Sequence, residues 1–200
     1  MKRTLIIFAK EPIAGRVKTR LGRDIGMTAA AWWYRHQSAG LVRTAARDRR
    51  WTTRLCITPD RALLCRAWGT EAVRHPQGTG DLGARMLRAL RAAPPGPVAL
   101  IGSDTPGANP TAIAATFDAL RGHDVVLGPA NDGGFWLVGL SNSQMRLPRP
   151  ALKDVRWSTE HALGDTVNSL APLRTGFADR LRDVDTGEDL RALASRPDAS

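Results

Sequence analysis

Residues 5–21 read LIIFAKEPIAGRVKTRL, in which a short apolar run is followed at once by Pro12, Gly15 and three basic residues. The apolar run, within Thr4–Ala9, predicts a buried first strand of an α/β sheet. Pro12 and Gly15 allow the chain to turn sharply after that strand. Backbone N–H groups and cationic side chains beyond a strand end form a binding site for anions such as phosphate. This stretch therefore favours an α/β protein with a nucleotide-like ligand.

The residues of this loop are candidate ligands for a nucleotide. We predict phosphate or nucleotide binding by Lys10, Gly15, Arg16, Lys18 and Arg20. Most basic clusters are solvated surface charges, but direct attachment to a strand end favours binding here. The loop matches neither the P-loop spacing nor the Rossmann glycine fingerprint, so it belongs to neither of those nucleotide-binding classes.

Composition limits the classes of partner. The 200 residues predict one domain, residues 1–200, with ample length for a hydrophobic core. Lys and Arg outnumber Asp and Glu by 29 to 19, which gives a formal charge of +10. Aromatic residues are not interleaved with the basic ones as a nucleic-acid stacking surface requires. We therefore expect no nucleic acid, and the charge is compatible with a small anionic substrate.

Cysteine usage and hydropathy predict a cytoplasmic protein. Cys56 and Cys65 are the only cysteines and have no metal-ligand spacing, so a disulfide framework is not expected. The apolar run at Leu5–Phe8 is too short for a signal peptide. No apolar segment approaches the ~20 residues needed to span a bilayer, so we expect no membrane partner.

Strand-like and helix-like runs alternate along the chain, as in a mixed α/β sheet. We predict strands at Thr4–Ala9, Arg54–Thr58, Glu71–Arg74, Val98–Ile101, Asp124–Leu127 and Phe135–Leu140. We predict helices at Thr28–Arg47, Asp60–Trp68, Asp81–Ala93 and Pro110–Arg121, and two more with N-caps at Ser158 and Thr186.

Two aspartates stand where a divalent cation could be held. Asp104 directly follows the apolar run Val98–Ile101, within Gly102–Pro106. An aspartate there can cap a turn or hold a cation, so both interpretations stay open. Asp185 precedes Thr186, the natural N-cap of the last helix. Its carboxylate is therefore free either for a second metal contact or for solvent.

Two glycine-rich loops could approach a ligand closely. The first suits the flat face of a nucleoside, or is simply a flexible loop before a helix; its candidate residues are Gln77, Gly78, Gly80 and Asp81. The second lies between two predicted strands, as a hairpin turn or as a ligand contact; its residues are Asp132, Gly133 and Gly134. Trp157, next to Ser158 and Thr159, is the aromatic residue that we place near a site.

Other catalytic classes find little support in the sequence. The four histidines show no metal-ligand spacing such as H-x-x-x-H or H-E-x-x-H. Ser103 and Ser158 lack the G-x-S-x-G pattern of a nucleophile elbow, which disfavours a serine hydrolase.

Six motifs occur in the order found in a known family. They are FAKxPxxGxVKTRL from residue 8, QGxGDLGxRM from 77, GSDxP from 102, GPxxDGG from 128, WST from 157 and DVDTxxDL from 183. Together they resemble a bacterial glycosyltransferase-A-type family whose members are labelled arsenosugar-biosynthesis or radical-SAM-associated glycosyltransferases. That family is similar to the guanylyltransferases that activate phospholactate in deazaflavin-cofactor biosynthesis. It is similar, more distantly, to molybdopterin guanylyltransferases.

The resemblance implies a nucleotide-diphospho-sugar transferase (GT-A, Rossmann-like) fold, in which helices flank a mixed, mostly parallel sheet. It implies that Arg16, Lys18 and Arg20 take the nucleotide phosphates. It also implies that Asp104 and Asp185 hold a divalent metal, Mg²⁺ or Mn²⁺. Gly187 departs from the family pattern, because a proline is expected at this position.

We therefore expect a metal-dependent transferase acting on a nucleotide or nucleotide-sugar and a small acceptor. The expected catalytic residues are Lys18, Arg20 and Asp104. The expected acceptor-binding residues are Asp132, Gly133, Gly134, Trp157, Ser158 and Thr159. The family label favours glycosyl transfer, whereas the Lys18–Arg20 pattern and the paired aspartates favour nucleotidyl transfer; a non-catalytic nucleotide-binding module is a third possibility. An aromatic stretch expected to be exposed, Trp32–Tyr34, suggests a homodimer.

Overall fold

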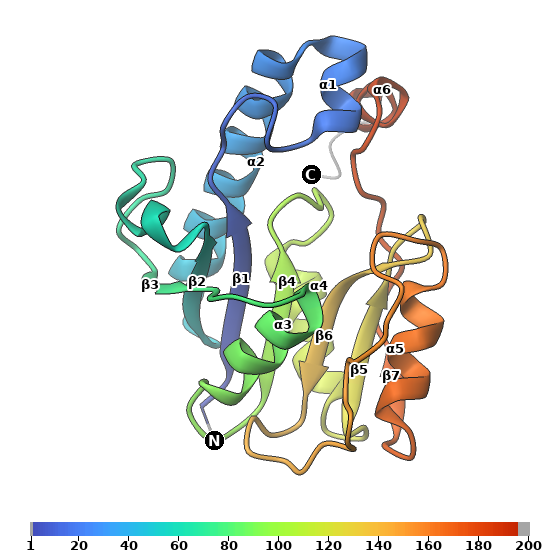
Figure 1. Cartoon of the computed structure of the whole chain (residues 1–200). Helices are drawn as coiled ribbons and strands as arrows, with labels where there is room; N and C mark the ends of the chain where they lie inside the picture. Colours follow the sequence, from blue (N-terminus) through green and yellow to red (C-terminus); the bar gives the residue numbers. More distant parts are fainter. Residues whose placement is uncertain (1, 196–200) are drawn as a thin grey trace.

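The computed structural model describes residues 2–195, and a seven-stranded sheet of order β3-β2-β1-β4-β6-β5-β7 forms its centre (Figure 1). The strands are β1 (Thr4–Lys10), β2 (Thr52–Thr58), β3 (Val73–Pro76), β4 (Val98–Gly102), β5 (Val125–Pro129), β6 (Phe135–Leu140) and β7 (Thr175–Phe177). Only β6 runs antiparallel to its neighbours, among the strands of the described residues. The predicted mixed, mostly parallel α/β sheet is confirmed.

Helices cover both faces of this sheet. They are α1 (Thr19–Ile25), α2 (Met27–Arg47), the 3₁₀ helix η1 (Asp60–Leu64), α3 (Leu82–Arg91), α4 (Pro110–Ala119), α5 (Ala162–Leu170) and α6 (Gly187–Ala194). Figure 1 shows α3 and α5 on the near face, with α2 and α4 behind the sheet. Helices α1 and α6 pack together beyond its upper edge.

The alternation of side chains along β1 explains why the sheet needs both layers. Leu5 and Ile7 point into the core beneath α2 and α4, whereas Ile6 and Phe8 point into the core beneath α3 and α5. Successive residues of a strand face opposite sides, so an unbroken apolar run is typical of a strand buried on both faces. All residues of β1 except Lys10 are buried.

The strand order reverses between β1 and β4, and this reversal places the site. The chain runs outward from β1 to β2 and β3, and then returns to place β4 on the other side of β1. The loops after β1 and β4 therefore diverge and leave a crevice beyond the carboxyl ends of these strands. Ligands of open α/β sheets bind in such crevices.

Several predicted boundaries were wrong. The helix expected over Asp60–Trp68 is the short η1, and the strand expected at Glu71–Arg74 lies at Val73–Pro76. Ser158 does not cap a helix, because its φ of 61° places it in the left-handed region, and α5 begins four residues later. The caps Asp81 and Thr186 are confirmed, each accepting a hydrogen bond from a backbone N–H of its helix.

Within residues 2–195, no helix combines the length and the apolar character that crossing a bilayer requires.

Candidate active site

The loop between β1 and α1 turns as its sequence predicts. Gly15 has a φ of 75°, in the left-handed region that glycine adopts without steric cost, and Arg16 N–H donates to the Ile13 carbonyl. Arg16 and Arg20 are exposed, whereas the Lys18 side chain is only 6 % exposed. Three basic residues close in sequence thus occupy two different environments.

Lys18 bridges the two aspartates proposed as metal ligands. Its Nζ lies 2.8 Å from Asp104 Oδ2 and 2.9 Å from Asp185 Oδ1. Arg20 Nη1 reaches the other Asp185 oxygen at 3.4 Å. Burial by itself would lower the pKa of Lys18, but the two carboxylates outweigh it and raise the pKa above its ordinary value. Lys18 is therefore a permanent cation between two anions.

The Lys18 backbone is held in an unusual conformation. Its φ of 45° and ψ of 47° lie in the left-handed region, which costs a residue with a side chain about 1–3 kcal/mol. The residue ends the loop and precedes α1, and its carbonyl accepts the Gly22 N–H. Strain of this size persists where the surroundings fix the conformation, as the two ion pairs do here.

The same geometry tests whether the site suits a metal. The Lys18 ammonium shows that a cation fits between Asp104 and Asp185, which stand on different segments. Within residues 2–195, no three His, Cys, Asp or Glu side chains are grouped to hold a metal by themselves. Mg²⁺ commonly uses one or two carboxylates together with substrate phosphates and waters, so the pair fits a metal that arrives with a nucleotide.

Tyr34, expected to be exposed, is a buried part of the site. Its hydroxyl accepts the Lys10 backbone N–H at 2.9 Å and lies 2.8 Å from Ser103 Oγ. Burial raises the pKa of Tyr34 to about 12, so the hydroxyl keeps its proton. Tyr34 thus ties the end of β1 to the segment that carries Asp104. The neighbouring Trp32 is the exposed residue, at 64 %.

A cavity of about 390 Å³ is lined by Lys10, Tyr34 and Ser103, the three residues joined by these hydrogen bonds. Of the predicted nucleotide ligands, it is lined by Lys10, Arg16, Lys18 and Gln77. Gln77 is buried, and its side-chain amide donates to the carbonyls of Ala9 and Cys56 while its oxygen accepts from Arg85. Gln77 therefore supports the ends of β1 and β2 with its whole amide.

The rest of the QGTGD loop lies outside this cavity. Gly78, Gly80 and Asp81 are not among the described residues that line it. Gly78 N–H donates to Asp60 Oδ1, and the Asp81 carboxylate accepts from Ala84 N–H as the cap of α3. Gly78 and Asp81 thus make hydrogen bonds that hold the loop, and nucleotide binding by Gly78, Gly80 and Asp81 stays a prediction.

A second cavity, of about 320 Å³, contains most of the predicted acceptor residues. They are Asp132, Gly134, Trp157, Ser158 and Thr159, joined by the bridging residues Lys18, Asp104 and Asp185. The two cavities share Lys18 and Asp104 in their walls. The reaction centre expected at these residues would therefore lie where the cavities meet.

The loop at residues 132–134 is both a hairpin and a cavity wall. It joins the antiparallel strands β5 and β6, as the hairpin interpretation predicts. Gly133 itself does not line the cavity in the described part of the chain, but a Cβ there would lie 2.4 Å from the Glu160 backbone. Glycine is required at this position because the hairpin there meets the backbone of Glu160, which directly follows the Trp157–Thr159 segment.

Asp183 is a site residue that the sequence analysis did not single out. Its Oδ1 accepts a hydrogen bond of 2.5 Å from Thr105 Oγ1, and the residue lines the second cavity with Asp132. Burial, together with the nearby Asp104 carboxylate, raises the pKa of Asp183 to about 6. Its position two residues before Asp185 was the one signal that could have identified it.

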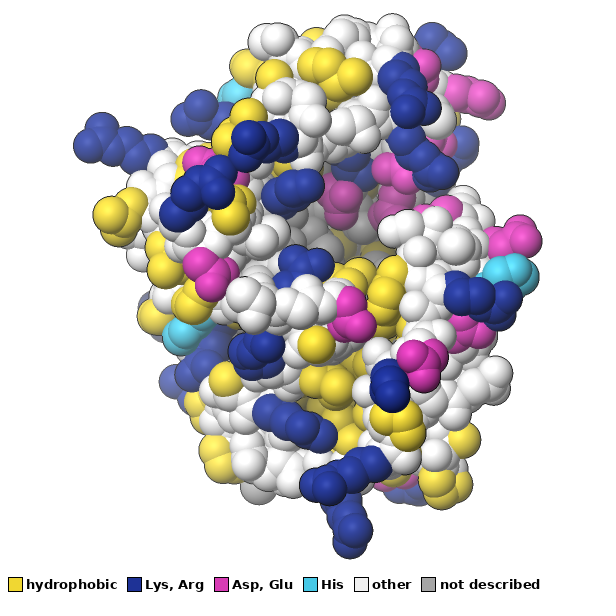
Figure 2. Space-filling model, in the orientation of Figure 1, with side chains coloured by type: hydrophobic (Ala, Val, Ile, Leu, Met, Phe, Trp, Pro, Cys, Tyr) yellow, Lys and Arg dark blue, Asp and Glu magenta, His cyan; other side chains and the backbone are white. Residues whose placement is uncertain are grey.

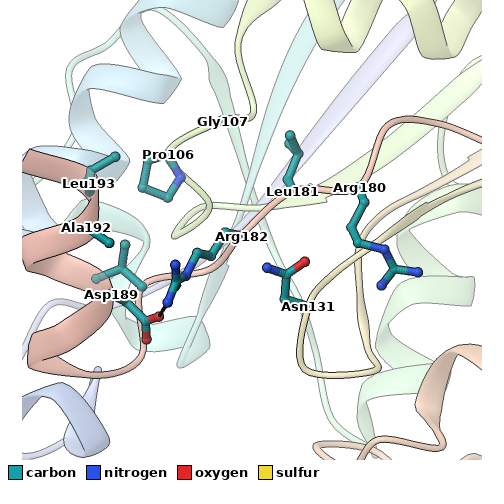
Figure 3. Close-up of a pocket in the computed structure, with 10 residues that line it drawn as sticks. Pro106, Gly107, Asn131, Arg180, Leu181, Arg182, Asp189, Ala192 and Leu193 are labelled. Carbon is teal, nitrogen blue, oxygen red and sulfur yellow. Dashed lines mark hydrogen bonds and ion pairs between the residues drawn. The ribbon is translucent and has the colours of Figure 1, made fainter. Parts of the chain in front are cut away.

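A third cavity, of about 250 Å³, lies beside α6 and the loops that follow β4 and β5 (Figure 3). Two arginines line it, but both are bound within the protein. Arg182 pairs with Asp189, and Arg180 donates to the Ala130 carbonyl at 2.8 Å. None of the predicted site residues lines this cavity among the described residues, so it is separate from the candidate active site.

Gly187 stands where the family pattern has a proline, and the structure gives a reason for this difference. Its N–H donates to Asp24 Oδ2 at 2.7 Å, which joins the end of α1 to the start of α6. A proline at this position has no N–H to donate. The bond holds the segment after Asp185 against the helix that follows Lys18.

Solved structures share this architecture. A protein from Desulfovibrio desulfuricans G20, whose proposed activity is that of a nucleotide-diphospho-sugar transferase, is 28 % identical with a TM-score of 0.85, over 100 % of this chain and 90 % of that one. Rv0371c from Mycobacterium tuberculosis H37Rv, in complex with manganese, is 19 % identical with a TM-score of 0.56, over 98 % and 99 %. A CMP:2-keto-3-deoxy-manno-octonic acid synthetase complexed with CTP is 12 % identical with a TM-score of 0.57, over 98 % and 99 %.

These matches confirm the predicted nucleotide-diphospho-sugar transferase fold, and the matched proteins include nucleotide-dependent transferases. No curated protein shows a significant sequence match to the chain. Residues 41–159 match the model of a family described as "Uncharacterized protein conserved in bacteria (DUF2064)". The chain belongs to this DUF2064 family.

Proposed function

We propose that this protein is a metal-dependent transferase that moves a glycosyl group from a nucleotide-diphospho-sugar to a small acceptor. The observation that carries the proposal is the meeting of two cavities at Lys18 and Asp104, with Asp185 on the opposite side of the Lys18 ammonium. One cavity presents basic residues suited to a diphosphate. The other presents the hairpin and Trp157, suited to an acceptor.

The proposed division of labour follows from charge. Glycosyl transfer builds negative charge on the departing nucleoside diphosphate, and fixed cations beside that charge lower the barrier. Lys18 and Arg20 would supply these cations, and Arg16 would bind the exposed side of the diphosphate. Asp104 and Asp185 would hold Mg²⁺ or Mn²⁺, which, when bound, neutralises phosphate charge as a Lewis acid. Manganese in the structure of Rv0371c supports this choice of metal.

Nucleotidyl transfer is the second candidate. It is favoured by two carboxylates that converge from separate segments, after β4 and before α6. Gly102-Ser103-Asp104 also lacks the local D-x-D that many glycosyltransferases place there. In this reaction the same cations would stabilise the α-phosphate under attack and the leaving pyrophosphate.

Asp104→Asn tests the metal assignment. We expect the variant to lose at least about tenfold in the Mg²⁺-dependent part of nucleotide affinity, because one of two carboxylate ligands is removed. Titration calorimetry with and without Mg²⁺ measures this part. Asp118→Asn is the matched control, since that carboxylate is 58 % exposed on α4. Unchanged metal dependence in Asp104→Asn would refute the assignment.

A ligand screen on the protein without substitutions distinguishes glycosyl transfer from nucleotidyl transfer. A thermal-shift screen of nucleotide-sugars against nucleoside triphosphates, with Mg²⁺ or Mn²⁺, should show larger stabilisation by a nucleotide-sugar. Preference for a triphosphate, followed by pyrophosphate release in the presence of an acceptor, would replace glycosyl transfer with nucleotidyl transfer.

A further inference from the structure

The second cavity has two chemically different ends. Four carboxylates line one end, those of Asp104, Asp132, Asp183 and Asp185. Apolar side chains line much of the rest, together with Ser158 and Thr159; the apolar residues include Phe8, Leu82, Met86, Phe135 and Trp157. In Figure 2 the central hollow shows acidic groups at its upper part and hydrophobic side chains below them. A ligand that fills the cavity therefore contacts both kinds of surface.

The only basic side chain among the described lining residues is already paired. This residue is Lys18, whose ammonium contacts two of the four carboxylates. No arginine or second lysine in this lining could take a phosphate or carboxylate of an acceptor. When Asp104 and Asp185 hold the proposed metal, Asp132 and Asp183 remain as acidic groups in this lining. An anionic acceptor would lie beside these like charges, which is unfavourable where water is partly excluded.

The apolar end is built to present flat surfaces. The rings of Phe135 and Trp157 meet edge to face, with centroids 6.1 Å apart. A Cβ on Gly83 would lie 3.0 Å from the Trp157 ring and 2.3 Å from the Leu152 carbonyl oxygen, so the absence of a side chain at Gly83 lets Trp157 pack against α3. Both aromatic residues remain partly exposed toward the cavity. Rigid, half-buried aromatic rings favour an aryl or alkyl partner.

We infer that the acceptor is an uncharged alcohol with an apolar aryl or alkyl body, and that phosphorylated or carboxylated acceptors are rejected. This inference rests on the proposed function. In the transfer, the acceptor hydroxyl oxygen forms a bond to the anomeric carbon while the bond from that carbon to the diphosphate oxygen breaks. The electron pair of the broken bond leaves with the nucleoside diphosphate, and the hydroxyl proton passes to solvent.

A matched pair of probes tests the charge rule. 3-Phenylpropan-1-ol and 3-phenylpropyl phosphate differ only in the phosphate, and ligand-observed NMR titrations with Mg²⁺ give their affinities. We expect the alcohol to bind at least about tenfold more tightly than the phosphate. Equal or tighter binding of the phosphate would overturn the inference. Asp132→Lys should raise the affinity for the phosphate, because it replaces an acidic group of the lining with a basic one.

Substitutions of tryptophan test the place of binding. Trp157→Ala should weaken binding of the alcohol at least about tenfold, while Trp157→Phe, which keeps an aromatic ring, should retain most of it. Trp32→Ala is the control, because Trp32 is 64 % exposed on α2 and outside this cavity. Equal affinity in Trp157→Ala and Trp32→Ala would place the alcohol elsewhere and overturn the inference.

A separate titration with nucleotide-sugars distinguishes failure of the acceptor inference from failure of the proposed transferase function. Nucleotide binding without preference for the alcohol would overturn the acceptor inference alone. Binding of the alcohol without any nucleotide binding would overturn the proposed transferase function.

Discussion

The Lys18 ammonium lies between two carboxylates, and these ion pairs help to hold its backbone in a left-handed conformation. A metal ion that binds Asp104 and Asp185 must therefore compete with a cation that belongs to the protein. The nucleotide would assist the exchange, because its phosphates offer Lys18 a new anionic partner. At the scale of one residue, this arrangement links metal binding to nucleotide binding.

Lys18→Met should increase the affinity for Mn²⁺ in the absence of nucleotide by at least about tenfold, which corresponds to about 1.4 kcal/mol. The two carboxylates then face each other without a cation, and the metal relieves their repulsion. Electron paramagnetic resonance of free Mn²⁺ measures the affinity. Lys153→Met, at an exposed lysine that is not among the described lining residues of either cavity, is the control. Unchanged or weaker Mn²⁺ binding would show that Lys18 does not compete with the metal.

Individual residues also show what a sequence can predict and what it cannot. Lys18, Asp104 and Asp185 were predicted to share one site, and the structure brings their side chains into contact, because the fold places the three segments at the same edge of the sheet. Their role in metal binding and catalysis stays a prediction. Tyr34 was misjudged, because it sits in a helix beside two tryptophans and nothing local shows which of the three turns inward. Its partners, Lys10 and Ser103, are 24 and 69 residues away, so only the tertiary packing shows its place.

Helix α6 positions the acidic segment through its first turn. Thr186 and Asp189 form a capping box, and Asp189 Oδ2 also accepts the Asp185 N–H at 3.1 Å. The Asp189 carboxylate pairs in addition with Arg182 at 2.8 Å. The Asp189 side chain therefore binds the backbone N–H groups of Asp185 and Thr186 and the guanidinium of Arg182, which precedes Asp183. It is placed outside both cavities of the candidate active site.

Asp189→Ala should lower the free energy of unfolding by about 1–2 kcal/mol through loss of the cap. It should also weaken Mn²⁺ binding about tenfold, because supporting hydrogen bonds orient metal ligands. Chemical denaturation and a Mn²⁺ titration measure the two effects. Glu188→Ala removes an exposed carboxylate from the same helical turn and should change neither quantity much. A loss of stability with unchanged Mn²⁺ affinity would mean that Asp185 does not depend on the cap.

Helices and strands were predicted best where they are long or have a clear pattern of apolar residues. The buried strands have strong apolar patterns, and the helix of 21 residues, α2, is long and rich in alanine; the sequence identified both. Helix α1 has seven residues with three charged side chains, and β7 has three residues. Neither is long enough to show a clear periodic pattern of apolar residues. The start of α5 was misplaced because Ser158 resembles a cap in sequence but adopts a left-handed backbone.

At the scale of the whole molecule, the face in Figure 2 carries many basic side chains and has a hollow that contains acidic and apolar side chains. Figure 2 shows Lys and Arg side chains around the rim of the central hollow, with acidic groups inside it. Such a rim attracts an anionic nucleotide from a distance, whereas an uncharged acceptor gains nothing from it. The sequence predicted the charge but not its arrangement, because the net charge of +10 does not show where the carboxylates gather.

This arrangement predicts different salt dependences for the two ligands. Raising NaCl from about 50 mM to about 500 mM should weaken nucleotide-sugar binding about tenfold, because salt screens exposed charges such as Arg16 and Arg20. Binding of 3-phenylpropan-1-ol should stay constant or tighten slightly, because apolar burial is not screened. Arg16→Gln with Arg20→Gln should flatten the salt dependence of the nucleotide alone. If both ligands weakened in parallel, the two cavities would not differ in charge as proposed.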